Sequence, residues 1–179
     1  EYLHSYISVL PYNELGAAAA AYNADEKELC RLDEIYSAAK TPFEIRSGSE
    51  KVTRRFFKIC NNGQESFTGL YRSLTEQGIC KGHQCIAYGL YMRDNGIELS
   101  EGLAVYGYSI CSAIVTNCVK LVPLSQLAGQ KILGESFELI SSASEKALFT
   151  DKNDIGISGA GFDLRAMQHE RLYSRQYMS

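Results

Sequence analysis

Cysteine and histidine lie close together in one short stretch of the sequence, where Cys80, His83 and Cys85 follow one another. Thiolate and imidazole groups are good ligands for zinc and nickel, so this spacing could serve a metal site. A structural metal site commonly uses about four ligands, and the remaining histidines, His4 and His169, stand near the two ends of the chain. Two hypotheses therefore stay open: a metal site, or a helix start at which His83 caps or packs while Cys85 enters the core.

The last residues of the chain combine types that are frequent where proteins bind proteins, because methionine, tyrosine and leucine alternate there with arginine and histidine. On an α-helix, one histidine and two tyrosines at four-residue steps would share a face, with two arginines beside them. A helix packed on the chain's own core and a tail that docks on a partner protein are both compatible with this pattern. The residues predicted to contact a partner are His169, Arg171, Tyr173, Arg175 and Tyr177.

No other motif points to catalysis or to a cofactor. The glycine-rich stretch 156–161 lacks the preceding strand and the lysine of a phosphate-binding loop. The aspartates and glutamates follow charged helix faces, and no pair of them is marked out for acid–base work. The basic and aromatic residues 54–58 form one short turn, and a net charge of −3 gives no bulk attraction to nucleic acid. We therefore predict a protein that is not an enzyme and that binds no cofactor and no nucleic acid.

The composition is that of a single globular domain. A chain of 179 residues, 45% of them hydrophobic, can bury a core without metal or disulfide support. No apolar run is judged to reach the roughly 18 residues needed to cross a bilayer, so we expect no membrane-spanning helix. Cys60, Cys85, Cys111 and Cys118 sit in apolar helical patterns, where cysteine behaves as a small buried hydrophobe. We therefore predict reduced thiols and a cytoplasmic location.

Helical periodicity dominates the sequence, whereas β-branched clusters are scarce. In Glu98–Leu121 the apolar residues recur every three or four positions and small residues fill the other faces, which predicts a helix in the centre of a bundle. Thr41 is expected to cap the helix that follows it, and Asn95-Gly96 to end another helix in the left-handed conformation. A single helix is predicted from Leu124 to about Ser142.

We predict one all-α domain over residues 1–179, a single-domain helical bundle of roughly eight to ten helices. Within it, residues 151–162 contain several glycines and are expected to form a mobile loop, and residues 163–179 form the partner-binding tail. A glycine inside a helix costs up to about 1 kcal/mol relative to alanine, so its presence signals close helix contact. Asn117 is expected to satisfy a buried backbone group. The residues assigned to core or dimer packing are Asn117, Pro123, Gln126, Gly129 and Gln130.

Two stretches together resemble a known family. The first, residues 117–132, contains the string Pro123-x-x-Gln126 followed by Gly129 and glutamine. The second is the end of the chain, where a Met-Gln-His-Glu string precedes the last arginine and tyrosine residues. In this order and spacing, the two stretches resemble the UreF family of urease accessory proteins, and the resemblance extends over most of the chain.

The resemblance implies an all-α homodimer without catalytic residues of its own. Such proteins bind the accessory protein UreD, called UreH in some bacteria, and through that complex the GTPase UreG. The assembly docks on apo-urease and helps to install nickel and to carbamylate the active-site lysine. By this resemblance Arg175 and Tyr177 would be contacts of the tail, His169 would organise it, and the tail would order against UreD and help to form the surface that receives UreG.

The resemblance also bears on the start of the chain. The family begins with a glycine-containing His-Ser stretch, and this sequence starts after it, at Glu1. An N-terminal piece is therefore expected to be missing, with impaired binding to UreD as a consequence. Two other functions stay open: a metallochaperone that binds nickel itself through Cys80, His83 and Cys85, and a helical interaction module with unrelated partners.

Overall fold

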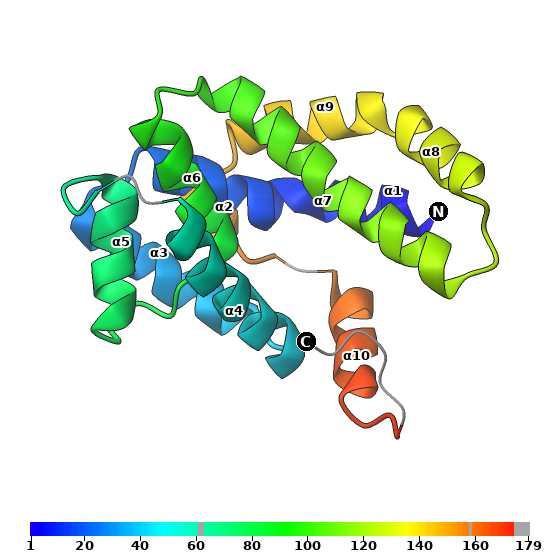
Figure 1. The fold of residues 1–179 in the computed structure, drawn as a ribbon, viewed down its shortest axis with the longest axis horizontal. Coiled ribbons are helices and arrows are strands. Elements are labelled where there is room, and N and C mark those ends of the chain that lie inside the picture. The colour runs from blue at the N-terminus through cyan, green and yellow to red at the C-terminus, as the bar shows by residue number, and fades with distance from the viewer. Residues whose placement is uncertain (61–62, 158, 174–179) are drawn as a thin grey trace.

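The structure is a computed structural model that describes residues 1–60, 63–157 and 159–173. Over these residues the chain forms ten α-helices, two 3-10 turns and no strand, so the all-α prediction is confirmed. Figure 1 shows most of the helices crossing one another in one body, with α10 standing at its lower edge. The elements are α1 (Tyr2–Val9), η1 (Leu10–Tyr12), α2 (Glu14–Tyr22), α3 (Glu26–Ala39), α4 (Phe43–Ile59), α5 (Phe67–Glu76), α6 (Gln84–Asp94), α7 (Leu99–Leu121), α8 (Gln126–Glu135), α9 (Phe137–Ala147), η2 (Lys152–Asp154) and α10 (Ala160–His169).

Local sequence signals fix several helix ends. The Asp25 carboxylate accepts a hydrogen bond from the Glu28 N–H, and the Glu28 carboxylate accepts one from the Asp25 N–H, which completes a capping box at the start of α3. The Ser125 hydroxyl oxygen accepts from the Ala128 N–H and caps α8. Gly96 follows α6 with a φ of 62°, so the left-handed helix end predicted there is confirmed.

Two helix boundaries differ from the prediction. Thr41 does not cap α4, because the N-cap position is Pro42, whose side chain makes no capping hydrogen bond. The single helix predicted from Leu124 to Ser142 is two helices, α8 and α9, which meet at Ser136. The buried Ser136 hydroxyl donates to the Ile132 carbonyl oxygen at 2.8 Å, a bond that competes with the regular helical ladder and favours a bend.

The centre of the fold is the crossing of α2 and α6, which lie together in the middle of the molecule (Figure 1). The alanine run of α2 is buried along most of its length and offers little side-chain volume to hold α6 away. Gly89 of α6 lies so close that a β-carbon there would stand 2.2 Å from the Ala18 carbonyl oxygen. Small residues on these two helices therefore permit the close packing at the core.

Helix α7 packs against α1, α2, α6, α8 and α9, as a central helix would, but one of its sides faces solvent, so the prediction of a central position is confirmed only in part. Leu103, Cys111 and Val115 are buried, and the helix packs against α8 and α9. Val105 and Tyr108 are exposed. A lack of charged side chains does not by itself bury a helix, because small and hydroxyl-bearing residues also tolerate contact with water.

The same helix is long and apolar enough to cross a membrane, judged by length and composition alone. Its apolar window has a mean hydropathy of 1.4, because residues 102–119 contain no charged side chain. The prediction that no stretch reaches this length is therefore wrong. The finding is only weak support for a membrane span, since core helices of soluble proteins meet the same criterion.

Candidate partner interface

Helix α10 rests on the surface of the bundle. The structure describes all of its residues, and none of them is buried. Phe162 packs edge to face against the rings of Tyr2 and Tyr6 of α1, at centroid distances of 5.3 and 5.5 Å. Further contacts are made with α4. We call α10 and the following residues 170–173 the C-terminal arm.

The loop before α10 is tied to the body of the protein. The Gly156 N–H donates to the Tyr12 carbonyl oxygen at 2.7 Å, and Asn13 Nδ2 donates to the Ile157 carbonyl oxygen at 3.1 Å. Helix α10 begins inside the predicted mobile loop, residues 151–162. Two hydrogen bonds therefore hold the end of the loop on the body of the protein just before α10, and the mobility of the loop stays a prediction.

Glu170 supplies the cap that α4 lacks in its own sequence. Its Oε1 accepts a hydrogen bond of 2.9 Å from the N–H of Phe43, the first residue of α4. Pro42, at the N-cap position before it, has no side-chain group that could accept this bond. Beside it, His169 Nδ1 lies 2.7 Å from Glu44 Oε2. A carboxylate at a helix N-terminus satisfies a free N–H and interacts favourably with the helix dipole. No role was predicted for Glu170, because Thr41 was expected to supply this cap and nothing nearby in the chain pairs Glu170 with α4.

Replacing Glu170 by alanine is expected to loosen the arm. Losing the cap removes about 1 kcal/mol of local stability, which corresponds to roughly fivefold faster amide hydrogen exchange at Phe43 and along α10. Hydrogen exchange followed by mass spectrometry measures this directly. Arg171→Ala changes an exposed neighbour and should leave the exchange unchanged. Equal protection in Glu170→Ala and the unmodified protein would show that this contact does not hold the arm.

The outward side of the arm is open to solvent. Tyr173 and Arg171 are exposed, whereas His169 is turned toward α4. The structure thus divides the predicted tail residues between a side that docks on the chain itself and a side that stays accessible. The predictions at Arg175 and Tyr177 lie outside the described residues. The exposed apolar side chains of the arm are Leu164, Met167 and Leu172.

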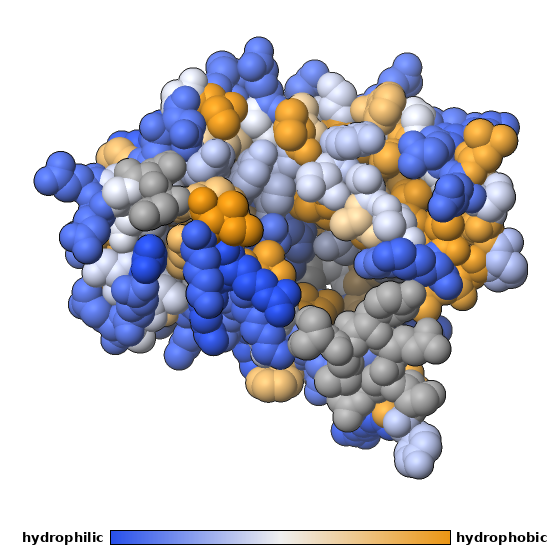
Figure 2. Space-filling view, in the orientation of Figure 1, coloured by the Kyte–Doolittle hydropathy of each residue, from blue (hydrophilic) through white to orange (hydrophobic). Residues whose placement is uncertain are grey.

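Large apolar side chains are also exposed along α7, in the turn after it and on α8, and we call this group the α7–α8 face. It has several large apolar side chains that contact water, and Figure 2 shows apolar surface over the end of the molecule where α7 finishes and α8 lies. Exposed apolar side chains of this kind are frequent where proteins meet. Those of the α7–α8 face are Val105, Tyr108, Leu121, Val122 and Leu127.

Of the five residues predicted to take part in core or dimer packing, one is buried beneath this face and four are exposed. Asn117 is exposed, so the prediction that it satisfies a buried backbone group is wrong: its side of α7 faces solvent. Pro123, Gln126 and Gln130 are exposed as well. Gly129 is buried where α8 approaches α7, and a β-carbon there would stand 2.6 Å from a Val119 methyl group. The other four residues remain available to a partner.

Cys80, His83 and Cys85 do not converge on a metal site, which corrects that hypothesis. His83 is fully buried, with Nε2 2.7 Å from the Ser37 hydroxyl and Nδ1 3.4 Å from the Ser49 hydroxyl. Its two nitrogens are therefore occupied by hydrogen bonds. In the described part of the chain, no group of three His, Cys, Asp or Glu side chains could hold a metal ion.

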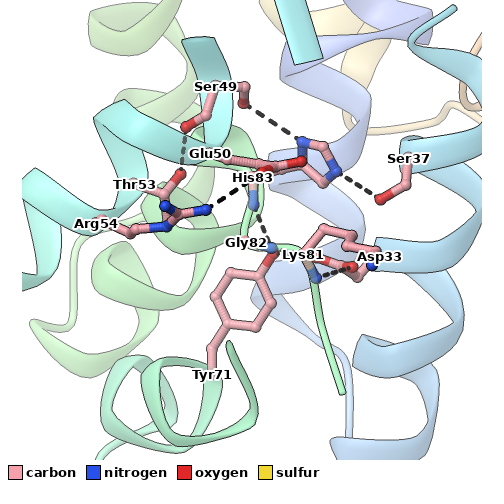
Figure 3. A network of polar contacts seen from close by, with 10 residues as sticks. All are labelled: Asp33, Ser37, Ser49, Glu50, Thr53, Arg54, Tyr71, Lys81, Gly82 and His83. Atoms are coloured by element: carbon pink, nitrogen blue, oxygen red, sulfur yellow. Dashed lines mark hydrogen bonds and ion pairs between the residues drawn. The ribbon is translucent and has the colours of Figure 1, made fainter. Parts of the chain in front are cut away.

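The polar contacts around His83 are organised by Asp33, which the sequence analysis missed (Figure 3). This buried carboxylate accepts hydrogen bonds from the Lys81 N–H at 2.7 Å, the Gly82 N–H at 3.0 Å and the Tyr71 hydroxyl at 2.5 Å. The Tyr71 oxygen in turn accepts from the His83 N–H at 2.8 Å. The network joins α3, α5 and the start of α6. An aspartate on the apolar face of an amphipathic helix was its sequence signal.

Stability is expected to fall in mild acid because of His83. Burial lowers the pKa of His83, the neighbouring charges of Lys40 and Arg46 lower it further, and the Asp33 carboxylate opposes them. The unfolded chain takes up a proton below about pH 6.5 that the folded chain excludes, so the free energy of unfolding decreases as pH falls through that value. Urea unfolding between about pH 7.5 and pH 5 measures the slope.

His83→Gln removes the titrating group from this experiment. The variant is expected to be less stable at every pH and to show a flatter pH dependence than the unmodified protein. An unchanged slope in His83→Gln would assign the acid sensitivity to other groups.

Comparison with known proteins decides the family. Residues 1–136, which cover α1 to α8, match the family model described as UreF. The chain belongs to the UreF family. The predicted resemblance to the UreF family is thereby confirmed.

Relatives of this UreF-family chain align along most of its length. The urease accessory protein UreF of Actinobacillus pleuropneumoniae serotype 5b is 32% identical over 173 residues, which cover 94% of this chain and 76% of the relative. That of Haemophilus influenzae is 33% identical over 174 residues, covering 94% and 74%. That of Paenarthrobacter aurescens is 32% identical over 152 residues, covering 83% and 67%.

Proposed function

We propose that this chain is a urease maturation factor that acts as a scaffold and not as an enzyme. In this proposal it works in the cytoplasm, binds UreD (UreH in some bacteria) and recruits the GTPase UreG to apo-urease. The assembly then installs nickel and supports carbamylation of the active-site lysine. The observation that carries the proposal is membership of the UreF family, whose aligned relatives are named urease accessory proteins.

The C-terminal arm supports a role in partner binding. Its inner side is held on α1 and α4, while Arg171 and Tyr173 are free of that contact and exposed. Arginine and tyrosine are the residues that most often carry binding energy in protein interfaces. We assign the outer side of the arm to UreD and UreG.

The α7–α8 face supports the proposed homodimer. Exposed side chains such as Leu127 and Val105 are costly to leave in water, and a symmetric contact would cover the same side chains on both copies. The exposed residues Asn117, Gln126 and Gln130 would then supply the polar rim of the interface.

The surroundings of the three candidate ligands argue against a metallochaperone that binds nickel itself. Cys80, His83 and Cys85 are buried, and the histidine nitrogens are hydrogen-bonded to serines. A cargo ion would have to displace these contacts and enter the core. We therefore assign nickel handling to the partners of this chain.

Co-purification with UreD and UreG tests the proposal. The chain is expected to retain both proteins on an affinity column, and the double variant Arg171→Ala with Tyr173→Ala should retain at least tenfold less of one or both. Arg72→Ala with Phe149→Ala, which removes an exposed arginine and an exposed aromatic ring away from the arm, is the matched control. Because a missing N-terminal stretch is expected to impair binding to UreD, a version extended by the corresponding stretch of a relative is tested in parallel, and failure of both versions to retain either partner would contradict the proposal.

A further inference from the structure

Two cysteine sulfurs meet where α3 passes the loop between α5 and α6. The Cys80 thiol donates a hydrogen bond to Cys30 Sγ across 3.8 Å, although the two residues are 50 positions apart in the chain. Cys80 is buried, with 2% of its surface exposed, and Cys30 on α3 is partly exposed. One residue of the pair is thus partly open to solvent, whereas the other is buried beside it.

The surrounding hydrogen bonds hold this contact in place. Asp33, nearly one turn after Cys30 on α3, accepts from the N–H groups of Lys81 and Gly82, which directly follow Cys80. On the other side, the Cys80 N–H donates to the Leu74 carbonyl oxygen at 3.2 Å. The two segments that carry the sulfurs are therefore already joined by other bonds, and their proximity is a fixed feature of the fold.

We propose that Cys30 and Cys80 form a reversible disulfide when the protein meets a hydroperoxide. A disulfide bond of about 2.05 Å requires the two sulfurs to approach by about 1.8 Å, which side-chain rotation and small backbone shifts can supply between segments already in contact. The inference is independent of the function proposed above. It concerns the oxidation state of Cys30 and Cys80 and does not require UreD or UreG.

The partly exposed sulfur reacts first. The Cys30 thiolate attacks one peroxide oxygen, the O–O bond breaks, and Cys30 becomes a sulfenic acid while the peroxide leaves as water or an alcohol. The Cys80 sulfur then attacks the Cys30 sulfur, the S–O bond breaks, and the hydroxide leaves with the Cys80 proton as water. Two thiols and one hydroperoxide thus give one disulfide, one water and one further water or alcohol.

The environment of Cys80 keeps this thiol from reacting with peroxide first. Burial raises the pKa of the Cys80 thiol, and the charge of Asp33 raises it further, so Cys80 remains a protonated thiol at neutral pH. A protonated, buried thiol is protected from direct attack by peroxide. Its attack on the oxidised Cys30 sulfur requires that the Cys80 proton leave as the S–S bond forms, and the departing hydroxide of the sulfenic acid takes up that proton.

Peptide mapping of the oxidised protein tests the proposal. The full chain is treated with hydrogen peroxide, alkylated without reduction, digested and analysed by mass spectrometry. A Cys30–Cys80 linked peptide that disappears after dithiothreitol is expected in the unmodified protein and equally in Cys118→Ser. The linked protein should melt roughly 5 to 10 °C higher than the reduced one, because the bond closes a long loop.

Cys80→Ser gives the second readout. This variant should stop at a sulfenic acid on Cys30, which dimedone labels, whereas the unmodified protein should lose dimedone reactivity at Cys30 as the disulfide forms. Recovery of Cys30 and Cys80 as separate alkylated peptides from peroxide-treated unmodified protein would overturn the proposal. This mapping does not depend on whether Cys80→Ser folds.

Discussion

Asp33→Ala is expected to lower the free energy of unfolding by about 3 to 5 kcal/mol. The substitution removes one buried carboxylate that accepts from two backbone N–H groups and from the Tyr71 hydroxyl. The two N–H groups belong to Lys81 and Gly82 in the loop before α6, and Gly82 is buried, so water does not readily replace the carboxylate there. Each donor left without a partner costs about 1 to 3 kcal/mol. Urea unfolding followed by circular dichroism measures the loss.

Two further variants make this result specific. Glu34→Ala changes the exposed neighbour on α3 and should shift stability by no more than about 0.5 kcal/mol. Tyr71→Phe removes one hydroxyl but leaves the carboxylate with its two N–H donors, so an intermediate loss of about 1 to 2 kcal/mol is expected. An Asp33→Ala protein as stable as Glu34→Ala would contradict the organising role of the network.

Gly89→Ala is expected to cost about 3 kcal/mol of stability, although alanine is the better helix former. The added methyl group would stand 2.2 Å from the carbonyl oxygen of Ala18 and 3.0 Å from the carbonyl carbon of the same residue. Both are backbone atoms, so no side chain can turn away and α2 and α6 must move apart. Because this crossing is the centre of the fold, the separation loosens packing on both helices.

The same substitution at Gly134 should act in the opposite direction. This glycine lies inside α8, and no atom stands within 4 Å of the position of an added β-carbon. Gly134→Ala is therefore expected to stabilise the protein by about 0.5 to 1 kcal/mol. Thermal unfolding of the two variants side by side separates the crowding effect from helix propensity. A Gly89→Ala protein that melts above the unmodified chain would refute the close crossing of α2 and α6.

The helices themselves were largely predictable from periodicity and end signals. The repeat of apolar residues defined Leu99–Leu121 to within a residue, and Gly96 ended the preceding helix as glycine chemistry requires. These features depend on residues close together in the chain. The bend at Ser136 was not predicted, because a serine in a helical pattern reads as tolerated until its buried hydroxyl is seen to bond with a backbone carbonyl.

Features that depend on distant residues were predicted less well. The exposure of one side of α7 could not be predicted from its composition, since the same small residues suit a crowded centre or an exposed face. Glu170 caps α4 from the far end of the chain, and Asp33 collects donors from α5 and the loop before α6. Neither pair of contacting residues can be predicted from the spacing of residues along the chain, because the partners are far apart in the sequence. The metal hypothesis failed for a related reason: Cys80, His83 and Cys85 are close in sequence but are directed to different partners.

Urease activation in cells is the most direct test of the scaffold role. A urease operon that carries UreD and UreG but lacks its UreF gene is supplied with this protein, with all genes taken from one source. We predict that urease activity and urease-bound nickel are restored, and that the Arg171→Ala, Tyr173→Ala variant restores much less of both. Urease that stays free of nickel, although the chain, UreD and UreG are all present as folded proteins, would contradict the account.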